Sequence, residues 1–154
     1  MKHTLTLGLS TPPLRVNWSA AAVLVLYTTC STAAPLLECP ASIPENSVKL
    51  IETPKGWTSF VGSPLYLHGA APMNGPPEHL GELADYKETG KKPNLTYIYQ
   101  LDGKFSEGKW LACTYGESDQ ITLAKRIADD VKVCTFKYKK GRHAGENEIG
   151  ILCE

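Results

Sequence analysis

Hydrophobic and polar residues alternate along several short stretches of the chain, as they do in half-buried β-strands. The alternation is strongest in residues 95–101, where one face carries Leu95, Tyr97, Tyr99 and Leu101. Shorter stretches at 109–115, 121–127, 131–139 and 149–153 follow it, separated by polar turns. This spacing predicts a mainly β protein built as a single antiparallel sheet or a small sandwich, with an α+β fold as the alternative.

Residues 109–140 organise this pattern, because they hold three expected strands and two cysteines. Leu111, Cys113 and Tyr115 share one face of the first of these strands. Cys134 shares a face with Phe136 and Tyr138 on the last. We interpret the stretch as a scaffold, with its aromatic side chains packed around cysteines.

The region upstream of residue 95 gives weaker signals. Alternation predicts strands at 47–52, 57–61 and 65–70. Residues 69–80 contain several Gly and Pro and predict a long ordered loop. Pro76 and Pro77 can open a short helix over 78–87, and residues 88–94 then form a polar turn.

The N-terminus has the pattern of an export signal. Lys2, His3 and Arg15 precede the apolar run at 20–27, and the first acid is Glu38. Small residues place cleavage after Ala33, and the apolar run is shorter than the roughly 20 residues that a membrane-spanning helix needs. Residues 1–33 are therefore predicted to be a cleaved signal peptide, with no integral membrane span. Acylation of Cys30, as in a bacterial lipoprotein, is the alternative.

Removing 33 of 154 residues leaves 121, the size of one domain over 34–154. All 16 acids lie after the signal, against 16 − 2 = 14 Lys and Arg, so the mature chain carries a net charge of about −2. This balance favours neither nucleic acid nor anionic lipid as a partner.

Four cysteines remain in the mature chain: Cys39, Cys113, Cys134 and Cys153. An even number in an exported chain predicts two disulfides, for which three connectivities exist. A meander would bring Cys113 near Cys134, and Cys39 and Cys153 lie at the two ends of the domain, so we expect these two pairs. A four-cysteine zinc site would need a C-x2-4-C spacing, which the sequence lacks.

Enzyme chemistry finds little support. His68, His79 and His143 lie in separate elements without metal-ligand spacing, and no G-x-S-x-G sequence supplies a serine nucleophile. The acidic pairs Asp129-Asp130 and Glu146-Glu148 lie in expected turns, where acids are common. We therefore predict no catalytic residues, no metal and no cofactor.

Two surface features remain. Basic residues cluster near the C-terminus without an intervening acid: Lys132, Lys137, Lys139, Lys140 and Arg142. We interpret them as the solvated face and end of an edge strand, and a positive patch for an acidic partner or an anionic glycan is the alternative. Tyrosine and tryptophan are enriched at binding hot spots, and a small-ligand pocket would be lined by Tyr97, Tyr99 and Trp110.

Several motifs together resemble a family of small exported proteins of Gram-negative bacteria. They are C-P-x-S-I at 39–43, Gly56-Trp57, G-P-P-E-x-L at 75–80, W-L-A-C-T-Y at 110–115 and Val133-Cys134. Some relatives lie near interbacterial toxin loci of type VI secretion. The resemblance implies a periplasmic location and an immunity role, and it transfers no catalytic residue.

The function that this pattern favours is a periplasmic immunity or inhibitor protein that blocks a cell-wall-degrading enzyme or toxin by protein–protein contact. A rigid sheet that presents an ordered loop lowers the entropic cost of binding. The candidate partner-binding residues are Met73, Asn74, Gly75, Pro76, Pro77, Glu78 and His79 on one loop, and Arg142 and His143 on another. An envelope-maintenance protein and a small-ligand-binding module are the alternatives.

Overall fold

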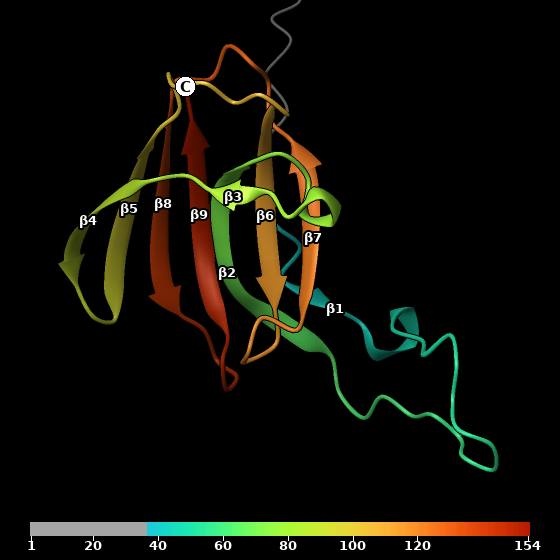
Figure 1. The fold of residues 1–154 in the computed structure, drawn as a ribbon. Coiled ribbons are helices and arrows are strands. Elements are labelled where there is room, and N and C mark those ends of the chain that lie inside the picture. The colour runs from blue at the N-terminus through green and yellow to red at the C-terminus, as the bar shows by residue number, and fades with distance from the viewer. Residues whose placement is uncertain (1–36) are drawn as a thin grey trace, which may run out of the picture. The chain divides into compact units, whose positions relative to one another are not determined.

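The computed structural model describes residues 37–154, which contain nine β-strands and two short 3-10 helices (Figure 1). The first part comprises β1 (Ser42–Ile43), η1 (Glu45–Ser47), β2 (Leu65–Asn74), η2 (Pro77–His79) and β3 (Glu82–Leu83). The remaining strands are β4 (Tyr86–Lys91), β5 (Asn94–Gln100), β6 (Lys109–Tyr115), β7 (Ile121–Arg126), β8 (Val133–Lys140) and β9 (Asn147–Cys153). The expected signal peptide and Cys30 lie outside the described residues.

The strands form two antiparallel sheets. One has the order β1-β2-β6-β7, with β3 also paired to β2, and the other has the order β4-β5-β8-β9. The chain passes between the sheets after β3, after β5 and after β7. The mainly β antiparallel prediction is confirmed, and two sheets rather than one make up the domain.

The strand register agrees with the alternation seen in the sequence. Across β5 and β8, Leu95 lies opposite Tyr138, Tyr97 opposite Phe136, and Tyr99 opposite Cys134. Residues directly opposite in a sheet project to the same side, so the two predicted faces form one aromatic surface. The strands predicted within 95–101, 109–115, 121–127, 131–139 and 149–153 are all confirmed.

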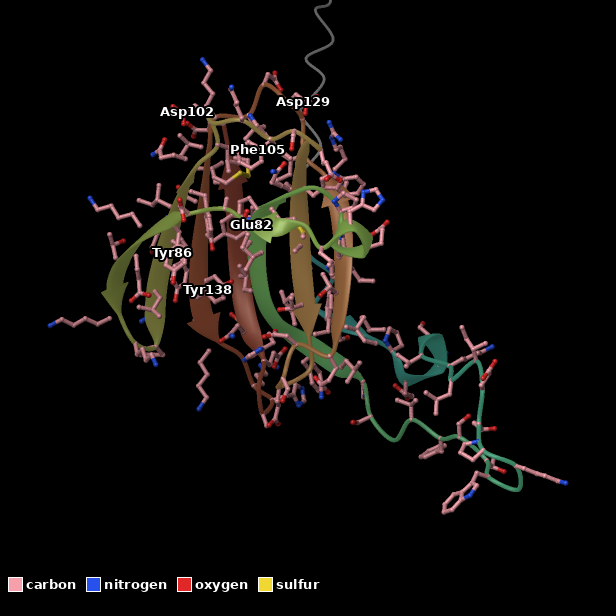
Figure 2. All side chains as sticks on the ribbon, viewed as in Figure 1. Glu82, Tyr86, Asp102, Phe105, Asp129 and Tyr138 are labelled. Carbon is pink, nitrogen blue, oxygen red and sulfur yellow. A yellow bond between two sulfur atoms is a disulfide. The ribbon has the colours of Figure 1, made fainter. Side chains whose placement is uncertain are left out.

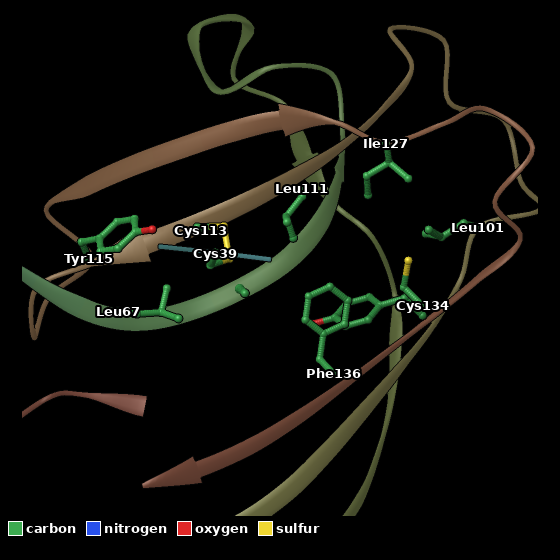
Figure 3. Close-up of a cluster of buried hydrophobic side chains, with 11 residues drawn as sticks. Cys39, Leu67, Leu101, Leu111, Cys113, Tyr115, Ile127, Cys134 and Phe136 are labelled. Carbon is green, nitrogen blue, oxygen red and sulfur yellow. A yellow bond between two sulfur atoms is a disulfide. The ribbon is translucent and has the colours of Figure 1, made fainter. Parts of the chain in front are cut away.

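The core lies where the sheets face each other (Figure 3). Phe136 and Cys134 from β8 and Leu111 and Tyr115 from β6 are buried almost completely. The Tyr115 hydroxyl donates a hydrogen bond of 2.9 Å to the carbonyl of Pro40, which ties the start of the domain to β6. Burying these rings removes large apolar areas from water and supplies most of the driving force for folding.

The two predicted disulfides form, but their pairing is different. Cys39 is bonded to Cys113, as Figure 3 shows, and Cys134 is bonded to Cys153. The expected Cys113–Cys134 pair is wrong because the chain leaves the first sheet after β7, so β6 and β8 belong to different sheets. Cys134 instead lies directly opposite Cys153 in the β8–β9 ladder.

β2 is longer than the sequence indicated. The predicted strand at 65–70 continues to Asn74, so the expected loop over 69–80 is reduced to residues after β2. Pro72 has no backbone N–H to donate, so it can lie in β2 only where that donor is not needed for pairing with β6. The backbone N and O of one strand residue point to the same side, and the Pro72 carbonyl accepts a hydrogen bond from Ala84 N at 2.9 Å. The missing N–H therefore lies on the β3 side of β2, and the pairing of β2 with β6 is intact.

The helix expected over 78–87 is absent from the described chain. Within this range only the end of η2 (Pro77–His79) is helical, and β3 (Glu82–Leu83) and the start of β4 (Tyr86–Lys91) are strands. The turn expected over 88–94 is confirmed only at Lys92 and Pro93, since β4 continues to Lys91 and pairs with β5 from Tyr86↔Tyr99 to Lys91↔Asn94. Pairing with a strong neighbouring strand outweighs the weak local propensity of this polar stretch.

The strands expected at 47–52 and 57–61 are wrong as well. Residues 48–64, which we call the 48–64 segment, form no strand. Ile51, Trp57 and Phe60 on this segment are 99%, 74% and 91% exposed. Local alternation creates a strand only where another strand offers backbone partners, and none lies beside this segment in the described part of the chain.

Backbone N–H and C=O groups on one edge of β2 form hydrogen bonds with side chains of the other sheet. The Tyr138 hydroxyl accepts a hydrogen bond from Ala70 N at 2.8 Å and donates one to Ala70 O at 2.7 Å. Asn147 Nδ2 donates to the carbonyl of His68 at 2.6 Å. These contacts occupy the stretch of β2 between its short pairings with β1 and β3, and they join the two sheets.

Candidate functional site

The structure places the two predicted binding loops at opposite ends of β2. Of the first loop, Met73, Gly75 and Pro76 are buried, Asn74 and Pro77 are half-buried, and Glu78 and His79 are exposed. Arg142 and His143 of the second loop are exposed, and the His143 ring stacks on Tyr66 near the start of β2 at 4.0 Å between centroids. Because β2 advances about 3.3 Å per residue, the two groups are too far apart to form one small site.

The chain from Gly75 to Tyr86, which we call the crossover segment, connects β2 to β4 across the front of the molecule in Figure 1. Gly75 N donates to Gly108 O at 3.0 Å, and Ala84 N donates to Pro72 O at 2.9 Å. His79 Nδ1 lies 2.8 Å from Glu107 Oε2. The segment is therefore held to the loop before β6 at its start and middle, and to β2 near its end.

Large apolar side chains on the crossover segment face solvent. Leu80 is 92% exposed, Leu83 61% and Tyr86 58%. Leu80 also has a positive φ of 57°, a conformation that costs a branched residue about 1 kcal/mol or more. Glu78, Glu82 and Asp85 flank these side chains, and Figure 2 shows Glu82 and Tyr86 along the segment. An anchored apolar patch with an acidic rim suits contact with a basic protein surface.

The second loop is closed by Glu146. Its Oε2 accepts hydrogen bonds from the backbone N of Arg142 at 2.7 Å and of His143 at 2.8 Å. The bond from His143 is the main reason why the pKa of Glu146 lies below its usual value. The carboxylate shapes this turn, so the loop is ordered by local contacts.

A cleft of about 300 Å³ lies between the sheets beside the crossover segment, and we call it the tyrosine cleft. One wall carries Tyr97 and Tyr138, whose rings meet edge to face at 5.1 Å, and Tyr86 meets Tyr97 in the same way at 5.1 Å. The full lining is His68, Gly69, Ala70, Ala71, Leu83, Tyr86, Tyr97, Tyr99, Ala112, Thr114, Asp119 and Tyr138. Figure 2 labels Tyr86 and Tyr138 on this wall.

The other end of the tyrosine cleft is polar. Asp119 Oδ1 lies 2.9 Å from His68 Nδ1 and also accepts a hydrogen bond from Thr114. Partial burial alone would raise the pKa of Asp119, but the hydrogen bonds from Thr114 and His68 and the charge of His68 lower it overall. A side chain on Gly69 would meet the Thr114 hydroxyl at 2.7 Å, so the glycine makes room for this arrangement.

Burial raises the pKa of three tyrosines of the cleft, Tyr97, Tyr99 and Tyr138. For Tyr97, desolvation comes first and the neighbouring Glu88 carboxylate adds to it. For Tyr138, desolvation outweighs the opposing effect of the hydrogen bond to Ala70. The hydroxyls of these three tyrosines are therefore neutral at physiological pH, and they offer hydrogen bonds and ring faces but no charge.

Only some of the residues that the sequence placed in a possible ligand pocket lie together in the structure. Tyr97 and Tyr99 line the tyrosine cleft, whereas Trp110 lies under Arg126 at 5.9 Å and takes no part in it. Asp129 pairs with Arg126 at 3.0 Å, and Glu148 lies 3.5 Å from Lys139, so these acids make surface ion pairs. No group of three or more metal-ligating side chains occurs in residues 37–154.

Sequence reasoning did not single out several residues of these surfaces: Leu80, Leu83, Tyr86, His68 as a partner of Asp119, and Thr114. His68 and Asp119 are 51 residues apart, and no local pattern links them. The position of Leu80 directly after a Gly- and Pro-rich stretch was a local indication that it could be exposed. We did not use this indication, because we placed Leu80 in a helix over 78–87.

Comparison with protein families decides the class of this protein. The family model of the type VI secretion system Tli immunity protein matches residues 62–154, which is more than half of the chain. The chain belongs to this family. The residues that match the family model include the crossover segment, the lining of the tyrosine cleft and both predicted loops. Most of the 48–64 segment lies before them. No curated protein and no solved structure shows a significant similarity to this chain.

Membership of the Tli immunity family makes the chain an immunity protein that blocks a toxin, so its partner is another protein. The predicted relation to type VI secretion loci is confirmed. Among the helices in residues 37–154, none has the length and apolar character required to cross a membrane.

Proposed function

We propose that this Tli immunity protein is exported and blocks its toxin in the periplasm by contact, without catalysis, through the crossover segment. The observation that carries the proposal is the exposure of Leu80, Leu83 and Tyr86 on a segment that is anchored to the sheet. Exposed apolar side chains on a rigid support give binding energy at low entropic cost. The exposed acids around them, Glu78, Glu82 and Asp85, favour a basic face on the toxin.

The periplasmic part of the proposal rests on two features. The N-terminal pattern is that of an export signal, and all four cysteines of residues 37–154 are in disulfides. Disulfides persist in oxidising compartments such as the bacterial periplasm. A toxin that degrades the cell wall acts in this compartment, and it is the target class that we favour.

The binding surface is tested with matched leucine variants. Leu83 is 61% exposed on the crossover segment and Leu152 is 62% exposed on β9, so the two leucines differ in place and not in exposure. The toxin that this protein blocks is titrated calorimetrically with the parent protein, with Leu80→Ser/Leu83→Ser and with Leu152→Ser. The double variant is expected to bind about 100-fold more weakly, as loss of a hot spot does, and Leu152→Ser within about threefold of the parent. Equal affinity of the double variant and the parent would show that the toxin binds elsewhere.

Export is tested in cells that receive the toxin in the periplasm. The full chain is expected to prevent lysis, and a chain that starts at Ala34 and stays in the cytoplasm is expected to give no protection. Protection by the truncated chain would refute the periplasmic site of action. Lysis with both chains would refute the choice of toxin.

A further inference from the structure

The tyrosine cleft joins an aromatic wall to an acidic end. The wall consists of the rings of Tyr86, Tyr97 and Tyr138, and the acidic end is the Asp119 carboxylate. None of the residues that line the cleft is Lys or Arg. The negative charge of Asp119 is therefore not cancelled by a permanent cation inside the cleft.

The walls suit an organic cation. A guanidinium or ammonium group is attracted to the face of an aromatic ring, and the interaction strengthens as water is removed. Ala71 and Ala112 present only methyl groups to the cleft, which leaves room for a long, thin side chain. A second carboxylate, Glu88, lies directly opposite Tyr97 in the β4–β5 ladder and adds negative charge at the aromatic end.

The acidic end is already in position. Asp119 has a positive φ of 52°, its backbone N bonds to Gly116 O at 3.0 Å, and its side chain is held by His68 and Thr114. His68 is the titratable group that faces it, with its Nδ1 at 2.9 Å from Asp119 Oδ1. A cation that enters the cleft therefore meets a fixed carboxylate and does not have to order it first.

We propose that the tyrosine cleft receives one arginine or lysine side chain of the toxin, with its charged end at Asp119 and its stem along the tyrosine wall. Leu83 and Tyr86 belong both to the crossover segment and to the cleft, so a toxin on the crossover segment reaches the cleft without leaving the interface. This inference rests on the proposed function and identifies the chemistry of the contact.

The first test uses a small probe and needs no toxin. N-acetyl-L-arginine methylamide is titrated into the ¹⁵N-labelled protein, with the neutral isostere N-acetyl-L-citrulline methylamide in parallel. Saturable shifts are expected at the amides of Ala71, Ala112 and Thr114 with the arginine probe. Asp119→Asn keeps the shape and tolerates positive φ, and it is expected to weaken binding about tenfold, as loss of a charge-assisted hydrogen bond does.

Two further variants separate charge from packing. Tyr97→Leu keeps an apolar wall but loses the ring face and is expected to weaken the probe about threefold. Asp102→Asn changes an exposed acid outside the cleft and is expected to leave binding unchanged. Equal binding of the citrulline probe, or of the arginine probe to Asp119→Asn, would overturn the proposal.

The second test measures the affinity of the toxin for Asp119→Asn, with Asp102→Asn as control. A loss of about tenfold in Asp119→Asn alone is expected. If the arginine probe binds in the cleft but the toxin affinity does not change, the cleft is not the site of the toxin's cation and the inference fails. If Leu80→Ser/Leu83→Ser keeps full toxin affinity, the proposal that the toxin binds the crossover segment is refuted. The probe titration still tests separately whether the tyrosine cleft binds a cation.

Discussion

The hydroxyl of Tyr138 on β8 makes two hydrogen bonds to the backbone of Ala70 on β2, accepting from the N–H at 2.8 Å and donating to the carbonyl at 2.7 Å. One side chain thus takes the place that a neighbouring strand would occupy at this point of the β2 edge. Backbone groups without a partner are costly when they are shielded from water, so this contact holds the two sheets together.

Tyr138→Phe is expected to lower the free energy of unfolding by about 1–3 kcal/mol, because it leaves both groups of Ala70 without their partner. Urea denaturation measures the change. Tyr86→Phe is the control, since the Tyr86 side chain is 58% exposed, and its effect is expected to stay within about 0.5 kcal/mol. Equal effects of the two variants would show that the bonds to Ala70 do not hold the sheets together.

Peptide mapping without reduction is expected to find Cys39 linked to Cys113 and Cys134 linked to Cys153. The paired alanine variants differ in the loop that each disulfide closes, with sequence separations of 74 and 19. The chain-entropy model gives a loss of about 4.5 kcal/mol for the Cys39–Cys113 pair and about 3 kcal/mol for the Cys134–Cys153 pair. A peptide containing Cys113 linked to Cys134 would contradict the fold described here.

Acid is expected to destabilise the protein through Asp119 and Glu146. The pKa of each carboxyl is lowered in the folded state, so folding favours the charged form. Their contribution is complete above the unfolded pKa of about 4 and is lost as the pH falls through the lower folded pKa. Asp119→Asn and Glu146→Gln should each flatten the decline of unfolding free energy with falling pH, measured by urea denaturation. A decline as steep as that of the parent would exclude the substituted group as a cause.

Leu80→Gly separates stability from binding. Glycine adopts positive φ without strain, so this variant is expected to be as stable as the parent or more stable by up to about 1 kcal/mol. Toxin affinity should nevertheless fall, because the exposed leucine is gone. Thermal unfolding and calorimetric titration give the two quantities. A stable variant with full affinity would remove Leu80 from the binding surface.

Trp57→Ser/Phe60→Ser tests the 48–64 segment. These side chains are 74% and 91% exposed, and both lie before the residues that match the Tli family. The double variant is expected to change unfolding free energy by no more than about 0.5 kcal/mol and to leave toxin affinity in place. A large loss of affinity would extend the interface to this segment, beyond the part of the chain shared with the family.

Much of the sheet could be predicted because its information is local. The faces carrying Leu95, Tyr97 and Tyr99 and carrying Cys134, Phe136 and Tyr138 follow from a period of two residues, which strand geometry imposes. β4 could not be predicted in this way, because all six of its residues are exposed and its pairing depends on β5. The first predicted loop was placed close to the crossover segment, but burial of Met73, Gly75 and Pro76 leaves only part of it accessible.

The sequence by itself determined the β class, the number of disulfides and the kind of function, since alternation, cysteine count and family motifs are properties of the chain. Tertiary structure decided which cysteines pair, because the path of the chain between the sheets separates Cys113 from Cys134. It also brought His68 to Asp119 across 51 residues and left Leu80 on the surface. Such contacts depend on which strands become neighbours, and that choice is made by packing the whole core.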